Sequence, residues 1–222
     1  MSAHCWQTGR LAANPLLPYT ALAGAKAMQD AAKEWDERYR QGLTMPDEPA
    51  AFLVENLSLL PKRGKALDIA MGTGRNALYL ASLGFQVTGI DLSAVAVEKC
   101  REKAERLGLP VEALLADLEH YPLPSEEYDL IVNFYYLQRS LTPSIVAALR
   151  RGGVLVFETF TIDQLQFDWG PKLPDHLLRP GELREMFAGL ETLLYHEGVI
   201  EGDRGPKAVA RLIGRKQSLV HD

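Results

Sequence analysis

Lys65-Ala-Leu-Asp-Ile-Ala-Met-Gly-Thr-Gly74 decides the fold of this chain. Residues 65–70 predict a short buried strand, residues 71–74 a glycine turn, and residues 75–83 have the apolar spacing of a helix. Gly72 and Gly74 have no Cβ and tolerate positive φ, so they let the backbone approach a ligand. A second buried strand, residues 86–91, ends on Asp91, which is placed to bind the two hydroxyls of a ribose. The stretch therefore predicts a nucleoside-binding strand, turn and helix.

Two nucleoside cofactors fit this arrangement. Gly72-x-Gly74-x-x-Ala77 matches the short dinucleotide fingerprint, in which glycine N–H groups and a helix N-terminus bind a pyrophosphate. Asp68 stands against that interpretation, because its negative charge would face the phosphates. S-adenosylmethionine has no phosphates and carries an amino group and a sulfonium, so carboxylates near its amino acid end are favourable. We expect S-adenosylmethionine as the cofactor and keep an NAD-dependent oxidoreductase as an alternative.

Length and composition narrow the class of protein further. The chain has 222 residues, a net charge of −5 and a pI near 5.6, which suits one globular domain without a general attraction to nucleic acid or anionic membranes. No apolar run approaches the ~20 residues of a membrane span. Cys5 and Cys100 are far apart and no Cys/His cluster has metal-binding spacing, so we expect no metal. These features predict a cytoplasmic monomer or homodimer whose partner is a small molecule.

The pattern of elements predicts an α/β fold. Residues 1–27 read as an extension that is possibly disordered, residues 28–216 as the domain and residues 217–222 as a tail. A helix is expected at 30–41, with Trp35 and Tyr39 on one face, and further helices at 50–60, 75–83, 95–107, 142–151 and 179–188. Strands are expected at 65–70, 86–91, 111–116, 128–133, 154–159, 192–200 and 207–213. The first five strands alternate with helices, and the last two form a hairpin. This order predicts a Rossmann-like, doubly wound seven-stranded sheet with one antiparallel strand.

A longer motif carries a family resemblance. Leu67-Asp-Ile-Ala-Met-Gly-Thr-Gly-Arg-Asn-Ala-Leu-Tyr-Leu80, together with Pro180-Gly-Glu-Leu-Arg184, resembles the TehB-like, tellurite-resistance branch of class I S-adenosylmethionine-dependent methyltransferases over residues 30–216. Ala70 replaces the first glycine of the family motif. The resemblance implies that the first residues of the motif line the methionine part of the cofactor, Asp91 the ribose and Asp117 the adenine. The predicted cofactor-binding residues are Asp68, Ala70, Gly72, Gly74, Asn76, Asp91, Leu92, Asp117, Leu118 and Asn133.

The residues that bind the methyl acceptor are harder to predict, because fewer of them belong to a recognisable motif. The branch methylates soft nucleophiles such as tellurite with a C-terminal His-Arg pair; Arg204 matches the arginine here, while Asp203 stands in place of the histidine. We predict Glu158, Arg204 and Tyr135 as catalytic residues, with Glu158 as the candidate base, and Tyr39, Trp169 and Arg179 as substrate-binding residues. The expected reaction is in-line methyl transfer to a thiol or chalcogen oxyanion, producing S-adenosylhomocysteine. A module that binds the cofactor without turnover is a further alternative.

Overall fold

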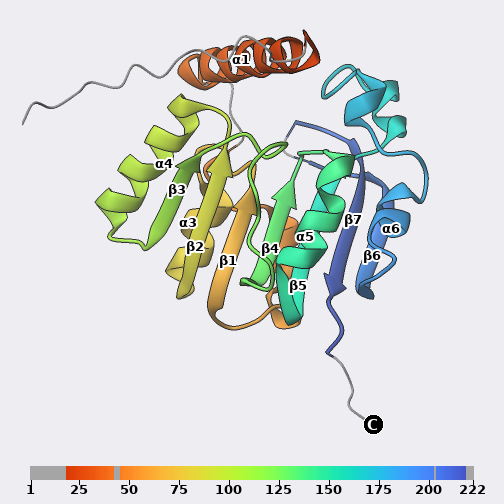
Figure 1. The fold of residues 1–222 in the computed structure, drawn as a ribbon. Helices are drawn as coiled ribbons and strands as arrows, with labels where there is room; N and C mark the ends of the chain where they lie inside the picture. The colour runs from red at the N-terminus through yellow and green to blue at the C-terminus, as the bar shows by residue number, and fades with distance from the viewer. Residues whose placement is uncertain (1–18, 43–45, 203, 219–222) are drawn as a thin grey trace, which may run out of the picture.

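The structure of the chain, a computed structural model, describes residues 19–42, 46–202 and 204–218, with side chains from residue 28 onward. In this part of the chain, seven strands form one sheet in the order β3-β2-β1-β4-β5-β7-β6 (Figure 1). The strands are β1 (Gly64–Ile69), β2 (Phe85–Asp91), β3 (Val111–Leu115), β4 (Tyr128–Phe134), β5 (Leu149–Phe160), β6 (Glu191–Ile200) and β7 (Lys207–Arg215). Within the described ranges, no helix has both the length and the apolar character needed to cross a membrane.

The strand directions confirm the predicted fold class. Strands β3, β2, β1, β4 and β5 pair in parallel, whereas β7 runs antiparallel to both of its neighbours, β5 and β6. The carboxyl ends of the parallel strands therefore lie at one edge, which we call the carboxyl edge. Because β7 is reversed, its first residue, Lys207, lies at that same edge, and Glu158 of β5 pairs with Arg211 of β7.

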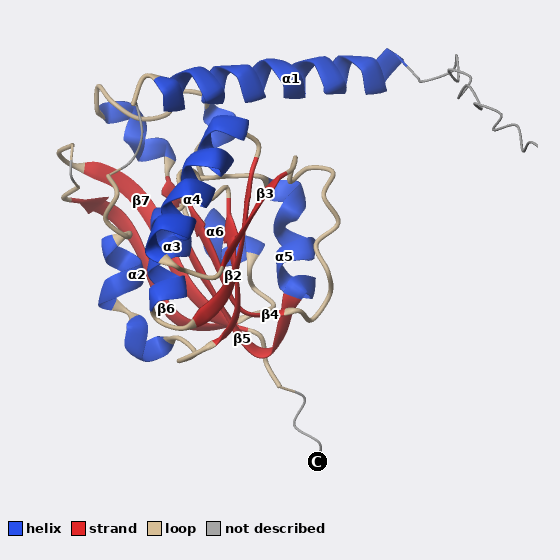
Figure 2. Ribbon diagram, turned by 90° about the vertical axis from the view of Figure 1, so that its left-hand side faces the viewer, coloured by secondary structure: helices blue, strands red, loops and turns tan. Residues whose placement is uncertain are grey.

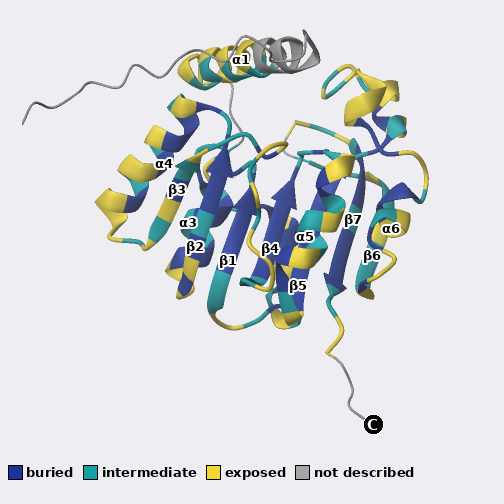
Figure 3. Ribbon diagram, viewed as in Figure 1, coloured by how far each residue is buried: buried dark blue, intermediate teal, exposed yellow. Residues whose placement is uncertain are grey.

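Helices cover both faces of the sheet. They are α1 (Tyr19–Arg40), α2 (Ala51–Glu55), α3 (Arg75–Ser82), α4 (Ala94–Leu107), α5 (Thr142–Ala148) and α6 (Glu182–Met186). Helices α2, α3 and α4 lie on one face and α5 and α6 on the other (Figures 1 and 2). The central strands are buried between the layers (Figure 3), which explains their nearly continuous apolar sequences.

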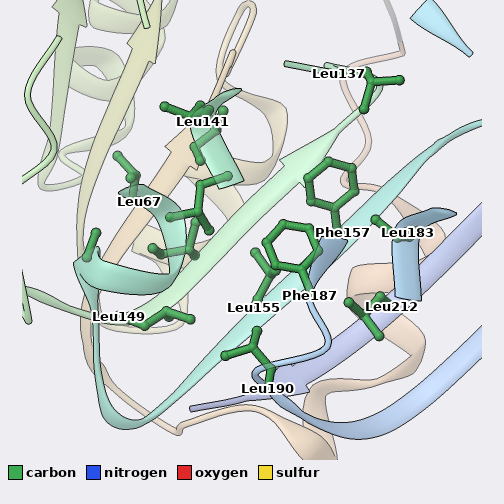
Figure 4. Close-up of a cluster of buried hydrophobic side chains, with 14 of the residues drawn as sticks. Leu67, Leu137, Leu141, Leu149, Leu155, Phe157, Leu183, Phe187, Leu190 and Leu212 are labelled. Carbon is green, nitrogen blue, oxygen red and sulfur yellow. The ribbon is translucent and has the colours of Figure 1, made fainter. Parts of the chain in front are cut away.

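Alternate residues of each central strand face different helical layers. Leu67 and Ile69 of β1 pack in the cluster of α5 and α6, whereas Ala66 packs in the cluster of α2 and α3. In the first cluster the rings of Phe157 and Phe187 lie 5.4 Å apart and are almost completely buried (Figure 4). Because Phe157 is fixed in this core, the next residue of β5, Glu158, points to the opposite face.

The fourth helix follows its sequence signals closely. Ser93 is its N-cap, and the Ser93 hydroxyl accepts a hydrogen bond of 3.1 Å from the Ala96 N–H. Gly108 ends the helix in the left-handed conformation, with φ at 63°. The structure thus confirms the helix predicted at 95–107 and begins it one residue earlier, at Ala94.

Several other boundaries were predicted wrongly. Helix α1 begins at Tyr19 rather than Asp30, because the alanine-rich residues 21–27 favour helix strongly. The predicted extension thus enters a helix at Tyr19, while residues 1–18 lie outside the described part. The single helix expected at 50–60 is α2 followed by the short 3₁₀ helix Leu57–Leu59, and Asn56 separates the two.

The ends of α5 and α6 also differ from the prediction. The helix predicted at 142–151 begins at Thr142, whose hydroxyl is buried without a hydrogen-bond partner among the described residues. Helix α5 stops at Ala148, because Leu149 already pairs with Tyr128 as part of β5. The helix expected at 179–188 has only the five residues of α6.

Candidate active site

The glycine turn, residues 71–74, joins β1 to α3 through left-handed backbone conformations. The φ angles are 51° at Ala70, 59° at Gly72 and 85° at Gly74. Glycine adopts such angles freely, whereas a residue with a Cβ incurs a cost of roughly 1–2 kcal/mol. Ala70, which replaces a glycine of the family motif, therefore has a strained backbone conformation.

Close packing also requires the two glycines. A Cβ on Gly72 would lie 2.9 Å from the hydroxyl oxygen of Tyr39, and a Cβ on Gly74 would lie 2.3 Å from Sγ of Cys100. The first contact comes from α1 and the second from α4. The turn is therefore enclosed by two helices that the sequence places on either side of it.

Asp91 stands at the end of β2, beside the glycine turn. Its carboxylate accepts hydrogen bonds of 2.8 Å from the N–H groups of Gly72 and Ser93. Its side chain is 7% exposed, and burial raises its pKa despite these two bonds. Each carboxylate oxygen can accept a second hydrogen bond, so Asp91 keeps the capacity to bind the two hydroxyls of a ribose.

Asp68 is the most unusual carboxylate of the site. It is 2% exposed, and its Oδ2 atom has no hydrogen-bond partner among the described residues. Burial raises the pKa of Asp68 to about 7, while the nearby Arg75 opposes that shift. A buried carboxylate oxygen without a partner is costly, which indicates a site built for a cationic or hydrogen-bonding ligand group.

The two predicted asparagines differ in their surroundings. Asn76 is buried and its Oδ1 accepts a hydrogen bond of 2.9 Å from the Ala50 N–H, so it fixes the segment before α2. Asn133, at the end of β4, is 1% exposed, and its Oδ1 is buried without a partner in the described structure. Of the two, Asn133 has the side chain that is free to bind a ligand.

The residues predicted to contact ribose and adenine follow β2 and β3. Leu92 is partly exposed directly after Asp91, whereas Leu118 is buried and belongs to the main core. The Asp117 carboxylate accepts a hydrogen bond of 3.0 Å from the Glu119 N–H and lies 2.6 Å from Nδ1 of His120. Asp117 is thus already paired within its own turn.

Helix α1 covers the glycine turn. Asp36 Oδ1 accepts hydrogen bonds from the Ser93 hydroxyl, at 2.5 Å, and from the Val95 N–H, at 3.1 Å, and Lys99 binds the carbonyl of Tyr39. Burial, together with the neighbouring carboxylates Asp91 and Asp68, raises the pKa of Tyr39. Tyr39 thus lies with the predicted cofactor residues.

A charged cluster lies at the other half of the carboxyl edge and consists of Tyr135, Glu158, Lys207 and Arg211. The Glu158 carboxylate is 1% exposed and accepts hydrogen bonds from the Tyr135 hydroxyl at 2.5 Å, Lys207 Nζ at 2.8 Å and Arg211 Nε at 2.7 Å. Lys207 Nζ also donates to the Tyr135 hydroxyl at 2.5 Å. Although burial raises the pKa of Glu158, the two cations and the phenol hold it below its ordinary value.

Tyr135 joins this cluster to an aromatic row made of Tyr135, Phe160 and Trp169. The Tyr135 and Phe160 rings are stacked with centroids 5.0 Å apart, and Trp169 meets Phe160 edge to face at 5.9 Å. Tyr135 has a φ of 63°, a strained value for a residue with a side chain. Trp169 was predicted to bind the substrate, and Figure 1 shows the segment after β5 at the carboxyl edge.

The two predicted arginines are exposed. Arg179 has 76% of its side chain exposed, and its guanidinium lies 3.5 Å from Glu182, whose carboxylate also accepts a hydrogen bond of 2.7 Å from the Arg179 N–H. Arg204 is exposed in the turn before β7, and Asp203 lies outside the described residues. Both arginines remain predictions for substrate binding and catalysis.

A groove of about 600 Å³ is lined by other residues. They belong to β1, β2, β3, β4 and the loops between these strands, and they include Lys65, Thr88, Val111 and Tyr128. None of the predicted site residues lines it. The carboxyl edge, where the unpartnered carboxylate and the strained residues gather, is therefore the better candidate for the active site.

Comparison with known proteins shows which proteins the chain resembles. Residues 66–153 match the model of a methyltransferase domain family. This chain therefore resembles a methyltransferase domain over less than half of its length. It is 29% identical over 165 residues to the "Probable S-adenosyl-L-methionine-dependent methyltransferase TehB" of Haemophilus influenzae, covering 69% of this chain and 57% of that protein. It is also 34% identical over 149 residues to Hemagglutinin 1 of Eikenella corrodens, covering 61% of this chain and 46% of that protein.

Solved structures agree with the fold of this chain. The TehB structure from Haemophilus influenzae matches with a TM-score of 0.64 and 24% identity, over 76% of this chain and 62% of that one. A methyltransferase structure from Methanosarcina mazei matches with a TM-score of 0.62 and 18% identity, over 76% of this chain and 99% of that one. The chain spans about half the length of the two sequence relatives named above.

The residues of this chain fit the cofactor that the sequence predicts. Gly72 and Gly74 leave room where a Cβ would crowd Tyr39 or Cys100, and Asp68 offers a buried oxygen without a partner among the described residues. Two further carboxylates, Asp91 and Asp117, follow the next two strands. Such a set suits a cationic amino acid end and a nucleoside, and it disfavours a pyrophosphate.

Four residues of the candidate site were not predicted: Arg75, Gln164, Lys207 and Arg211. Lys207 and Arg211 are four residues apart on one strand, so they share a face. That spacing was visible in the sequence. The pairing of β7 with β5 was needed to bring both residues to Glu158, which lies 49 positions before Lys207 in the chain.

Proposed function

We propose that the chain transfers a methyl group from S-adenosylmethionine to a small-molecule acceptor that is a soft or anionic nucleophile, such as a thiol or a chalcogen oxyanion. Residues 28–216 are the proposed catalytic domain. The observation that carries the proposal is the buried oxygen of Asp68, which has no partner among the described residues, beside a glycine turn where a side chain would be strained and crowded. A positively charged amino group is the ligand group that best satisfies such an oxygen.

The other residues of this half then have definite roles. Asp91 would accept hydrogen bonds from the ribose hydroxyls while it keeps its two bonds to the backbone of the glycine turn and of Ser93. Asp117, supported by Leu118, would accept a hydrogen bond from the adenine amine in competition with His120. Tyr39 would cover the methionine part from α1, since its hydroxyl already lies against Gly72.

The transfer step requires little covalent chemistry from the residues of the chain. When bound, the cofactor supplies a methyl carbon attached to a positively charged sulfur. A lone pair of the acceptor forms the new bond as the carbon–sulfur bond breaks, and the bonding electron pair stays on sulfur. An anionic acceptor loses no proton in this step, so the residues of the chain need only to align the three atoms and exclude water.

Glu158 has the wrong properties for a general base near neutral pH. Its carboxylate is already paired with Lys207 and Arg211, which hold its pKa below the ordinary value. A base works best when its pKa lies near the working pH. We therefore assign Glu158 the role of a buried counter-ion that holds Tyr135 and Lys207 in place.

The alternatives from the sequence can be weighed against the same residues. A dinucleotide would place a pyrophosphate beside Asp68 and Asp91, both of which are buried carboxylates. A module that binds the cofactor without turnover would need the glycine turn and the carboxylates, yet it has no use for a strained tyrosine in a charged cluster. The strain at Tyr135 favours turnover, since such strain gathers at active sites.

Isothermal titration calorimetry with S-adenosylhomocysteine tests the proposal directly. We expect the wild type to bind and Asp91→Ala to bind about 1.5 to 3 kcal/mol more weakly, because a carboxylate that accepts two hydroxyls is lost. Glu102→Ala, on the exposed side of α4, is the matched control and should bind like the wild type. A wild type that gives no heat with S-adenosylhomocysteine but binds NADH would refute the proposal.

Turnover is tested separately, by following S-adenosylhomocysteine formation with a set of thiols and chalcogen oxyanions. Methyl transfer to any member supports an enzyme. Binding of the cofactor without transfer to any acceptor, in a set that also includes alcohols, amines and carboxylates, favours the module without turnover.

A further inference from the structure

The aromatic row offers a partly exposed apolar surface at the carboxyl edge. Tyr135, Phe160 and Trp169 are all partly exposed, although large aromatic side chains are usually buried when they serve only the core. Their rings follow one another at 5.0 Å and 5.9 Å. The row therefore provides a surface on which a flat apolar group can pack.

Gln164 fixes one end of this row. Its side chain is completely buried; Nε2 donates a hydrogen bond of 2.8 Å to the Trp169 carbonyl, and Oε1 accepts one of 2.9 Å from the Ala208 N–H. Gly170 is packed against the same amide, since a Cβ there would lie 2.9 Å from Gln164 Nε2. A single glutamine thus holds the tryptophan loop to the strand residue next to Lys207.

Lys207 places positive charge at the other end of the row. Its ammonium has three protons, and the described structure engages two of them, on Glu158 and on the Tyr135 hydroxyl. Lys207 and Arg211 together outweigh the single charge of Glu158. The Arg75 guanidinium adds a further positive charge 5.9 Å from the centroid of the Tyr135 ring. The cluster therefore has a net positive charge and a donor that can still bind an anion.

We infer that the acceptor is an organic anion with a flat apolar body, whose body packs on Phe160 and Trp169 and whose anionic group binds Lys207. This inference rests on the proposed function and narrows its acceptor class. A bare inorganic oxyanion would meet aromatic rings that donate no hydrogen bonds from their faces, whereas a flat organic anion would use both parts of the site. Lys207 then becomes the residue that selects the charge of the acceptor, and Trp169 the one that selects its body.

Three probes separate the two contributions in the complex saturated with S-adenosylhomocysteine. Benzoate carries a flat body and a negative charge, benzamide carries the same body without the charge, and selenite carries charge without the body. We expect calorimetry to show benzoate binding at least about tenfold tighter than either of the others, which corresponds to about 1.4 kcal/mol. Equal affinity for benzoate and benzamide, or preference for selenite, would overturn the inference.

Variants assign the two contributions to residues. Lys207→Gln keeps a hydrogen-bond donor for Glu158 but loses the charge, so the preference for benzoate over benzamide should vanish, and Lys207→Arg should restore it. Trp169→Ala should weaken the binding of benzoate and of benzamide by the same factor. Lys62→Met, at an exposed lysine near the amino end of β1, changes the net charge equally and should leave all three affinities unchanged.

The outcomes also separate this inference from the proposed function. Binding of S-adenosylhomocysteine by each variant shows that the fold is intact, whatever happens to the probes. If the cofactor product binds the wild type and Lys207→Gln still prefers benzoate, the role of Lys207 is wrong and the methyltransferase proposal stands. If S-adenosylhomocysteine does not bind the wild type, the proposed function itself fails.

Discussion

The carboxylate of Asp36 accepts a hydrogen bond of 2.5 Å from the hydroxyl of Ser93, a residue 57 positions later in the chain. Ser93 is the N-cap of α4, so one hydroxyl group links the first helix to the start of another. Although burial raises the pKa of Asp36, its bonds to Ser93 and Val95 hold that pKa below the ordinary value. This pair fixes α1 over the glycine turn.

Replacing Asp36 by alanine should loosen α1 from the body of the protein. We expect a loss of about 1–2 kcal/mol in the free energy of unfolding, the usual value of an acceptor at a helix N-terminus. Affinity for S-adenosylhomocysteine should fall as well, because Tyr39 would no longer be held over Gly72. Urea denaturation and calorimetry measure the two effects. Glu34→Ala, on the exposed side of α1, is the control, and equal effects of both substitutions would contradict this role of Asp36.

Replacing Ala70 by glycine should stabilise the protein. Ala70 has a φ of 51°, so glycine removes a strain of roughly 1–2 kcal/mol. Glycine also makes the unfolded chain more flexible, which offsets about 0.4–1 kcal/mol of that gain. The net result should be a higher midpoint in urea denaturation. At Ala94, the exposed first residue of α4, the same substitution should lower the midpoint instead.

The stability of the free protein should fall as the pH rises from about 4 to about 7. Burial raises the pKa of Asp68 to about 7 from 3.8, so the folded state binds more protons than the unfolded state between those values. Its contribution is therefore present at low pH and is lost as the pH rises through the folded pKa. Asp68→Asn should flatten this part of the profile. Thermal melting at several pH values measures it, and an unchanged slope in the variant would exclude Asp68 as its source.

The affinity of the wild type for S-adenosylhomocysteine should depend on pH in the opposite direction to the stability of the free protein. A positively charged amino group beside Asp68 favours the ionised carboxylate, so affinity should increase as the pH rises from 6 to 8. Calorimetry over this range measures the effect. In Asp68→Asn the affinity should be lower and should no longer increase with pH.

Gln164→Ala should destabilise the protein by about 2 to 4 kcal/mol, because two hydrogen bonds are lost and the Ala208 N–H is left buried without a partner. The KM of the acceptor should rise more than that of the cofactor, since Trp169 loses its anchor. Gln166→Ala, an exposed residue that binds only the nearby Asp163 carbonyl, is the control. An equal rise in both KM values would indicate general loosening rather than a local effect.

The cofactor half of the site could be predicted from sequence because its residues are close together in the chain. Asp68, the glycine turn and Asp91 lie within 24 consecutive residues, and each follows a strand whose apolar pattern is clear. The start of α1 was missed because the alanine-rich residues 21–27 have no polar and apolar alternation. Their helix propensity was the signal that could have revealed it.

The acceptor half could be predicted only in part, because it depends on pairing between distant strands. Tyr135, directly after β4, and Glu158, near the end of β5, were predicted as catalytic residues. Lys207 and Arg211 were missed, since nothing in a local sequence window tells that β7 lies beside β5. No sequence pattern pointed to Gln164. In sequence alone, a glutamine in a loop looks like a surface residue, and only the structure shows that it is buried and bonded to Trp169 and Ala208.

The reversal of β7 divides the carboxyl edge into parts that can change independently. Most of the proposed cofactor residues come from the ends of β1, β2 and β3 and from the turns that follow them, whereas the charged cluster comes from β5, the start of β7 and the residue after β4. The turn between β6 and β7 opens at this edge, so its length and sequence can vary without disturbing the glycine turn. A family built on this plan can exchange one acceptor for another while it keeps the same nucleoside site, and hybrid proteins that swap residues 200–207 between relatives should inherit the acceptor preference of the donor.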